Sequence, residues 1–265
     1  MRFGWAVPHL DTYSLKEWEN ILGAIASAGF HGIEPLIAHP AQIPTRDFLD
    51  LLAENELEIF AFRTGAIAKE HNVTFNAPTQ AERDEAVRRF IAVIRFAAGY
   101  GKPHLIVGWI QGWKREQQSY AEVEENLAFC LRKCAVEAEK DGITILLEPL
   151  NTLELNYHNR VGEVVAYLDR VQIPGIGIVL DTYHMKLEGE DFGEAIRSAR
   201  SYLEHFHLAD EKRCTPRWSE FEYPMLQNVL EQIGYQGGMT LETNEPSSKL
   251  VMLHAQDFLS AFQKN

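Results

Sequence analysis

Short apolar runs alternate along the chain with segments in which apolar residues recur at helical spacing, such as Val87, Phe90, Ile91 and Ile94. This alternation is typical of repeated βα units that build a parallel sheet. The length of 265 residues suits eight such units, so we predict an α/β fold, a single (β/α)8 or TIM barrel. The predicted strands are Phe3–Val7, Gly32–Leu36, Ile59–Phe62, Leu105–Gly108, Ile143–Glu148, Ile176–Asp181, Leu203–His207 and Met239–Glu242.

Several predicted helices carry a clear start signal. A hydroxyl residue is followed three positions later by Glu in the pairs Ser14 with Glu17, Thr79 with Glu82, and Ser119 with Glu122. In such a pair the two side chains satisfy free N–H groups of the first helical turn. The longest segments without a regular pattern, residues 63–78, 109–118 and 208–223, follow predicted strands, so we expect them to be loops at one mouth of the barrel.

Composition narrows the class of protein. No Pro/Gly/Ser-rich linker divides the chain, so we predict one domain over residues 1–265. No apolar segment approaches the roughly 20 residues that cross a bilayer, and the first residues lack a signal peptide, which predicts a cytoplasmic protein without membrane partners. The net charge of −13 argues against nucleic acid as a partner. Three cysteines are too few for a disulfide framework, and the oligomeric state is left open, a homo-oligomer included.

A potential metal ligand stands at the end of each of the last four predicted strands: Glu148, Asp181, His207 and Glu242. Their spacings of 33, 26 and 35 residues are close to the roughly 30 residues of one βα unit. Because the carboxyl ends of barrel strands converge on one mouth, we expect the four side chains to meet there. A mostly oxygen donor set suits manganese, magnesium or cobalt better than zinc, so we predict one such divalent cation.

Each of these residues also has an ordinary structural interpretation. A carboxylate at a strand end often caps the next helix, and a single histidine is more often a hydrogen-bonded core residue. Four such residues in register favour the metal site, because burying three carboxylates together is costly without a cation.

The sequence around these positions resembles a known family. It contains Glu148-Pro149-Leu150-Asn151, Asp181-Thr182-Tyr183-His184-Met185 and His207-Leu208-Ala209-Asp210, with Glu242 closing the last strand. These motifs are similar to those of the sugar isomerase/epimerase family of xylose-isomerase-like barrels. Within it, the chain most resembles the ketose 3-epimerases and keto-sugar-acid epimerases. The similarity covers nearly the whole chain.

This resemblance implies that the four strand-end residues bind one divalent cation and that three further residues contact the substrate. These are Glu154, six places after the first ligand, His184, three after the second, and Arg213, six after the third. Family members commonly follow this arginine with Pro-Gly-x-Gly, whereas this chain has Pro216-Arg217-Trp218-Ser219. Arg217 and Ser219 in place of the glycines predict a turn of different shape.

The same residue types suit proton transfer at a carbon next to a carbonyl. Epimerisation by this route needs a base on one face, an acid on the other, and stabilisation of the developing enediolate. Glu148 and Glu242, on the fifth and eighth strands, are predicted to be the acid/base pair, with Asp181 and His207 acting mainly as ligands. The cation would polarise the carbonyl and neutralise the enediolate.

We therefore predict a metal-dependent isomerase or epimerase of a ketose, sugar phosphate or keto-sugar acid, acting on a small-molecule sugar through a cis-enediolate. Three alternatives remain open: a keto-inositol dehydratase, an abasic-site DNA endonuclease and a non-catalytic sugar-binding barrel. The acidic charge and the lack of histidines at the ends of strands three and four disfavour the endonuclease. Most basic residues of the mouth loops are interpreted as solvated charges, which leaves a phosphorylated substrate open: Arg63, Lys69, Lys114, Arg115 and Lys212.

Overall fold

The computed structural model describes residues 1–10, 12–217, 223–244 and 255–260. Within them, nine strands form one closed parallel sheet in the order β1-β9-β8-β7-β6-β5-β4-β2-β3, and β1 also pairs with β2. The strands are β1 (Arg2–His9), β2 (Gly32–Leu36), β3 (Glu58–Ile59), β4 (Ala61–Arg63), β5 (His104–Val107), β6 (Ile145–Leu147), β7 (Ile176–Asp181), β8 (Leu203–Leu208) and β9 (Gly238–Leu241). Because β3 and β4 share the third strand position beside β2, the sheet closes as an eight-membered barrel. The predicted barrel fold is confirmed.

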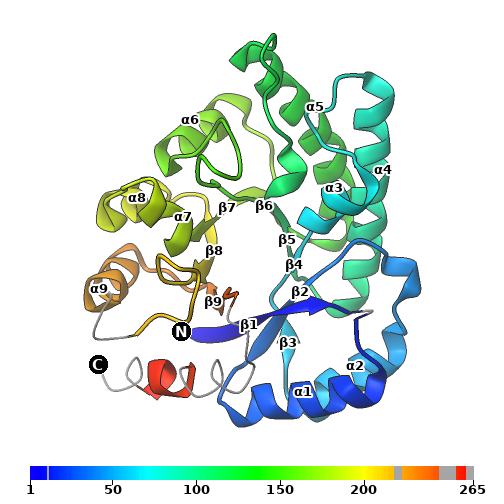
Figure 1. Ribbon diagram of the computed structural model, residues 1–265, viewed down its shortest axis with the longest axis vertical. Coiled ribbons are helices and arrows are strands. Elements are labelled where there is room, and N and C mark those ends of the chain that lie inside the picture. The colour runs from blue at the N-terminus through cyan, green and yellow to red at the C-terminus, as the bar shows by residue number, and fades with distance from the viewer. Residues whose placement is uncertain (11, 218–222, 245–254, 261–265) are drawn as a thin grey trace.

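Helices surround the strands (Figure 1). They are α1 (Leu15–Ser27), α2 (Thr45–Glu54), α3 (Gly65–His71), α4 (Gln80–Ala97), α5 (Tyr120–Ala138), α6 (Val161–Val171), α7 (Thr182–Leu187), α8 (Phe192–Ser198) and α9 (Tyr223–Ile233), with 3-10 turns η1 (Pro40–Gln42), η2 (Ala98–Tyr100), η3 (Trp109–Gln111) and η4 (Glu139–Asp141). Among the described helices, none combines the length and the apolar character needed to cross a membrane. The single-domain organisation stays a prediction.

The three predicted helix starts are capping boxes in the structure. Ser14, Thr79 and Ser119 each accept a hydrogen bond from the backbone N–H three residues later, and the Glu there binds back to the cap. These caps begin α1, α4 and α5. Each start was readable from the sequence because the interaction spans only one helical turn.

Two expectations about local structure need correction. The third predicted strand is divided at Phe60 into β3 and β4. The Phe60 ring fits because Gly4 of β1 and Gly32 of β2 have no side chain. A Cβ would lie 2.8 Å from the ring at Gly4 and 2.6 Å from it at Gly32. The segment 63–78 is also not wholly irregular. It contains α3, which forms because Ala66 and Ile67 bury apolar side chains on the barrel.

Strand residues alternate between two buried layers. Ala61, Ile106, Leu146 and Val179, from four adjacent strands, form one small cluster. The residues before and after the last three, and Phe62 after Ala61, belong to the large core that packs against the helices. Successive side chains of a strand point to opposite faces, so the small cluster lies inside the barrel. A residue two positions after one of these therefore also points inward, at the carboxyl end of its strand.

Candidate metal centre and substrate cavity

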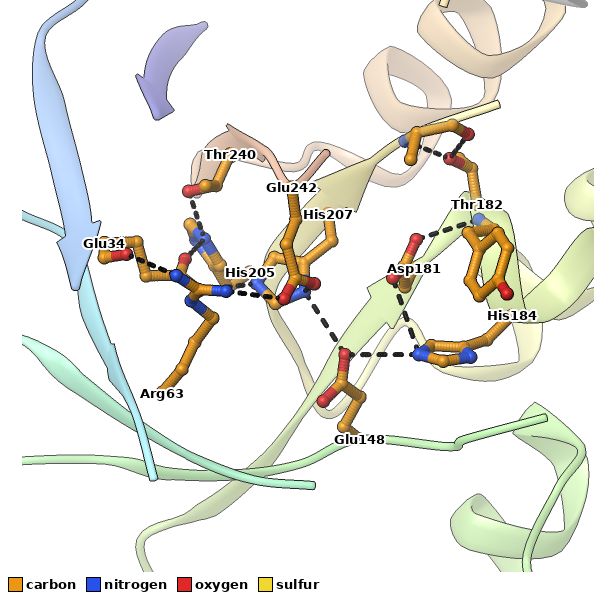
Figure 2. Close-up of polar contacts among 12 residues, drawn as sticks. Glu34, Arg63, Glu148, Asp181, Thr182, His184, His205, His207, Thr240 and Glu242 are labelled. Carbon is orange, nitrogen blue, oxygen red and sulfur yellow. Dashed lines mark hydrogen bonds and ion pairs between the residues drawn. The ribbon is translucent and has the colours of Figure 1, made fainter. Parts of the chain in front are cut away.

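The four predicted ligands meet in one buried cluster (Figure 2). One ligand atom from each of Glu148, Asp181, His207 and Glu242 lies within 4.8 Å of the others. Strand parity explains the convergence. Glu148 comes two residues after Leu146 and Asp181 two after Val179, so both carboxylates follow the inward-facing layer to the mouth of the barrel.

The two carboxylate oxygens of Asp181 have different surroundings. Its Oδ1 accepts a hydrogen bond from the Tyr183 N–H at 2.8 Å and so caps α7. Its Oδ2 is buried and has no hydrogen-bond partner in the described chain; His184 Nε2 and Arg213 Nη2 lie 3.6 and 3.7 Å from it. A buried carboxylate oxygen without a donor is costly, so this atom is well suited to bind a cation.

His207 presents its two nitrogens to different groups. Nδ1 lies 3.0 Å from Glu242 Oε2 and 3.3 Å from Glu148 Oε1, and Nε2 lies 3.0 Å from Glu34 Oε1. Burial would lower the pKa of His207, but the carboxylates of Glu34 and Glu242 hold it well above its usual value. To bind a cation, Nδ1 would give up its proton, and the proton on Nε2 would still face Glu34. A carboxylate behind a histidine in this way orients it as a metal ligand.

Glu34 and Arg63 are part of the centre although the sequence interpretation did not select them. Glu34 is fully buried on β2 and also contacts His205 Nε2 at 3.0 Å. Arg63, treated above as a solvated charge, donates from Nη1 to Glu242 Oε1 at 2.8 Å and from Nη2 to the Val7 carbonyl at 2.6 Å. Arg63 is therefore paired with protein groups and is not a solvated charge. Glu34 could have been selected from the sequence by strand parity, because it follows the inward-facing Gly32 by two positions.

The two glutamates assigned to catalysis differ in their electrostatic surroundings. Burial raises the pKa of Glu148, and His207 only partly offsets this. Burial would also raise the pKa of Glu242, but Arg213, at 2.9 Å, together with His207 and Arg63, holds it well below its usual range. Burial raises the pKa of Asp181 to about 6 despite the charge of Arg213. A divalent cation would relieve the crowding of these carboxylates.

A cavity of about 620 Å³ opens above the cluster and is lined by all three predicted substrate contacts. Glu154 accepts a hydrogen bond from Trp109 Nε1 at 2.6 Å and lies 3.5 Å from Arg213. Arg213 also stacks over Tyr183 where it lines the cavity, and its positive φ of 56° is uncommon for an arginine. Of the two residues that replace glycines, Arg217 is described and exposed, whereas Ser219 lies outside the described residues, so the different shape of this turn stays a prediction.

The fold is a closed parallel barrel, and its mouth contains a buried cluster of carboxylates and a histidine that could hold a cation. The chain belongs to the xylose isomerase-like TIM barrel family, whose model matches residues 22–262. The family resemblance inferred from the motifs is confirmed.

Particular relatives are sugar epimerases by name. The chain is 30% identical over 241 residues to L-ribulose 3-epimerase of Methylomonas sp. (strain DH-1), covering 91% of the chain and 83% of that protein. It is 29% identical over 112 residues to 3-dehydro-D-guloside 4-epimerase of Escherichia coli (strain K12), covering 42% and 43%. The chain has the same fold as the crystal structure of a D-allulose 3-epimerase from Methylomonas sp. in complex with D-allulose, with a TM-score of 0.85. The two chains are 23% identical, and the superposition covers 100% of this chain and 96% of the other. These relatives are enzymes, in agreement with the prediction of an enzyme.

Proposed function

We propose that the chain is a divalent-metal-dependent epimerase of a ketose or keto-sugar, acting at the carbon next to the carbonyl. One observation carries this proposal: the carboxylates of Glu148 and Glu242 border the same cation-binding cluster at the floor of a sugar-sized cavity. The names of the relatives, which include 3-epimerases and a 4-epimerase, support the same reaction class.

The donor set fits a cation. Glu148, Asp181, His207 and Glu242 would hold it through three carboxylate oxygens and one imidazole nitrogen, a set that favours manganese, magnesium or cobalt over zinc. When bound, the cation supplies polarisation of the substrate carbonyl and neutralisation of the charge that develops on its oxygens.

The chain's own residues then move the proton. Glu148 follows β6 and Glu242 follows β9, two strands that are separated in the sheet by β7 and β8, so their carboxylates reach the cavity from different directions. One carboxylate removes the proton from the carbon beside the carbonyl, and the other returns a proton to the opposite face of the enediolate. The product keeps the composition of the substrate and differs in one stereocentre.

Glu154, His184 and Arg213 are proposed to bind the sugar. The Arg213 guanidinium and the His184 imidazole offer donors to sugar oxygens, and the Glu154 carboxylate offers acceptors. Trp109 braces Glu154 at the rim and is itself 47% exposed, so its ring is available to cover the apolar face of a sugar.

An isotope experiment tests the reaction class. L-ribulose or D-allulose is incubated with the Mn²⁺-loaded protein in deuterium oxide. We expect an epimeric product that carries deuterium on the carbon next to the carbonyl, because the carboxyl group that protonates the opposite face has exchanged its proton with the solvent. A product that has lost water would instead identify a dehydratase, and turnover without any isotope would contradict proton exchange with solvent.

A second experiment tests the two glutamates. Glu148→Gln and Glu242→Gln preserve size but remove the basic oxygen, so each is expected to reduce turnover by more than the roughly 10²–10⁴-fold typical of acid/base catalysis. Glu139→Gln, at an exposed glutamate of η4, is the matched control. Near-normal turnover of either cavity variant would remove that glutamate from the mechanism.

A further inference from the structure

Asn151, in the loop after β6, contacts the ring of His184 with two donors. Its backbone N–H lies 3.2 Å from His184 Nδ1, and its side-chain Nδ2 lies 2.7 Å from the same atom. Both residues are buried, with 0% and 1% of their surface exposed. Two N–H groups that converge on one ring nitrogen require that nitrogen to be an acceptor.

The orientation of the Asn151 amide is set by a second contact. The Leu153 N–H lies 2.9 Å from Asn151 Oδ1. Because a backbone N–H only donates, the oxygen of the amide must face Leu153, and the NH2 group must therefore face His184. This loop contact removes the ambiguity between the two amide orientations.

The other ring nitrogen of His184 is directed at the reaction centre. Nε2 is buried, and within the described chain it has no hydrogen-bond partner. It lies 3.6 Å from Asp181 Oδ2 and 3.9 Å from Glu148 Oε1 and borders the cavity (Figure 2). With Nδ1 accepting, the ring proton is on Nε2, where it faces the space beside the two carboxylates.

We propose that Asn151 is a positioning residue that holds His184 in the Nε2–H tautomer, so that the histidine offers a hydrogen-bond donor to a substrate oxygen beside Glu148. This inference rests on the proposed epimerase function. In the opposite tautomer, Nδ1–H would meet two further N–H groups, and a lone pair on Nε2 would face the carboxylates of the cluster. Both changes are unfavourable, so the asparagine selects one tautomer.

Two substitutions separate tautomer control from support of the loop. Asn151→Asp keeps an oxygen for the Leu153 N–H but places a second carboxylate oxygen against His184, which draws the ring proton to Nδ1. Asn151→Ala removes the contact to Leu153, but the backbone N–H of residue 151 still donates to Nδ1. We expect kcat to fall on the order of 10²-fold for Asn151→Asp and less than about tenfold for Asn151→Ala.

A role limited to loop structure would give the opposite order, because only the aspartate retains the Leu153 contact. Leu153→Asp controls for added charge, since this side chain is in the same loop and is 78% exposed. It is expected to leave kcat close to that of the parent protein. Alanine more damaging than aspartate, or Leu153→Asp as damaging as Asn151→Asp, would overturn the proposal.

Nitrogen-15 NMR of the Mg²⁺-loaded protein tests the tautomer without substrate. The His184 signals are assigned as those lost in His184→Gln. We expect the proton on Nε2 in the parent protein and in Asn151→Ala, and on Nδ1 in Asn151→Asp. A proton on Nδ1 in the parent protein would refute the inference. If the tautomers agree but no epimerisation of any sugar is found, the proposed function fails while the positioning role stands.

Discussion

Gly108, directly after β5, leaves the space that the Glu148 carboxylate occupies. A Cβ built on this glycine would lie 2.6 Å from Glu148 Oε2 and 3.8 Å from the carboxyl carbon. The backbone of Glu148 is held in place by hydrogen bonds from its N–H to the Val107 carbonyl and from Gln111 Nε2 to its own carbonyl. Gly108→Ala should therefore displace the carboxylate of Glu148 and leave the strand in place.

The size of the effect follows from this contact. An ordinary contact begins at 3.4 Å, so the carboxylate must withdraw by about 0.8 Å. A displacement of about 1 Å of a group at the reaction centre can cost roughly 10²-fold in rate. Overpacking in a buried site costs about 1–3 kcal/mol, which is compatible with a folded barrel. We expect kcat to fall about 10²-fold and Mn²⁺ affinity to fall about tenfold or more.

The assay combines three measurements on the same preparation: Mn²⁺ affinity by calorimetry, turnover of D-allulose, and the thermal midpoint. Gly162→Ala is the matched control. Gly162 is in the first turn of α6, and a Cβ there would meet nothing within 4 Å, so alanine should leave activity unchanged and keep or slightly raise stability. Parental metal affinity and turnover in Gly108→Ala would refute the placement of Glu148 at the metal centre.

Three further predictions concern the cluster and the base of the barrel. Asp181→Asn should weaken Mn²⁺ binding but leave the thermal midpoint of the metal-free protein unchanged, because asparagine still caps α7. A much lower thermal midpoint would show that Asp181 is mainly structural. Glu34→Gln should lower metal affinity about 10–100-fold by releasing His207, and unchanged affinity would contradict the role of Glu34. Burial lowers the pKa of His104 from 6.5 to about 4. Between these pH values the unfolded chain binds a proton at His104 that the folded chain does not. The contribution of the neutral, buried His104 to stability is therefore present above pH 6.5 and is lost as the pH falls toward 4. His104→Phe should flatten the fall in unfolding free energy over that range, by up to about 1.4 kcal/mol per pH unit, and parallel curves would count against it.

The strands, the helix starts and the four candidate ligands were predictable from the sequence because each depends on short-range rules. A capping box such as Ser14 with Glu17 spans one helical turn, and strand parity alone carries Glu148 and Asp181 to the inner face at the mouth. The prediction of the ligand set needed only the fold class, because every strand of a parallel barrel delivers its carboxyl end to the same place.

Only the tertiary structure decided which other groups complete the centre. Arg63 reaches Glu242 across 179 residues of sequence, and Glu34 reaches His205 across 171. Asn151 likewise contacts His184 only because β6 and β7 are neighbours. These contacts depend on side-chain rotamers and on the packing of distant strands, and no local pattern encodes either. The sequence alone therefore determined which carboxylates and histidine gather at the mouth, and packing determined how each is charged, oriented and paired.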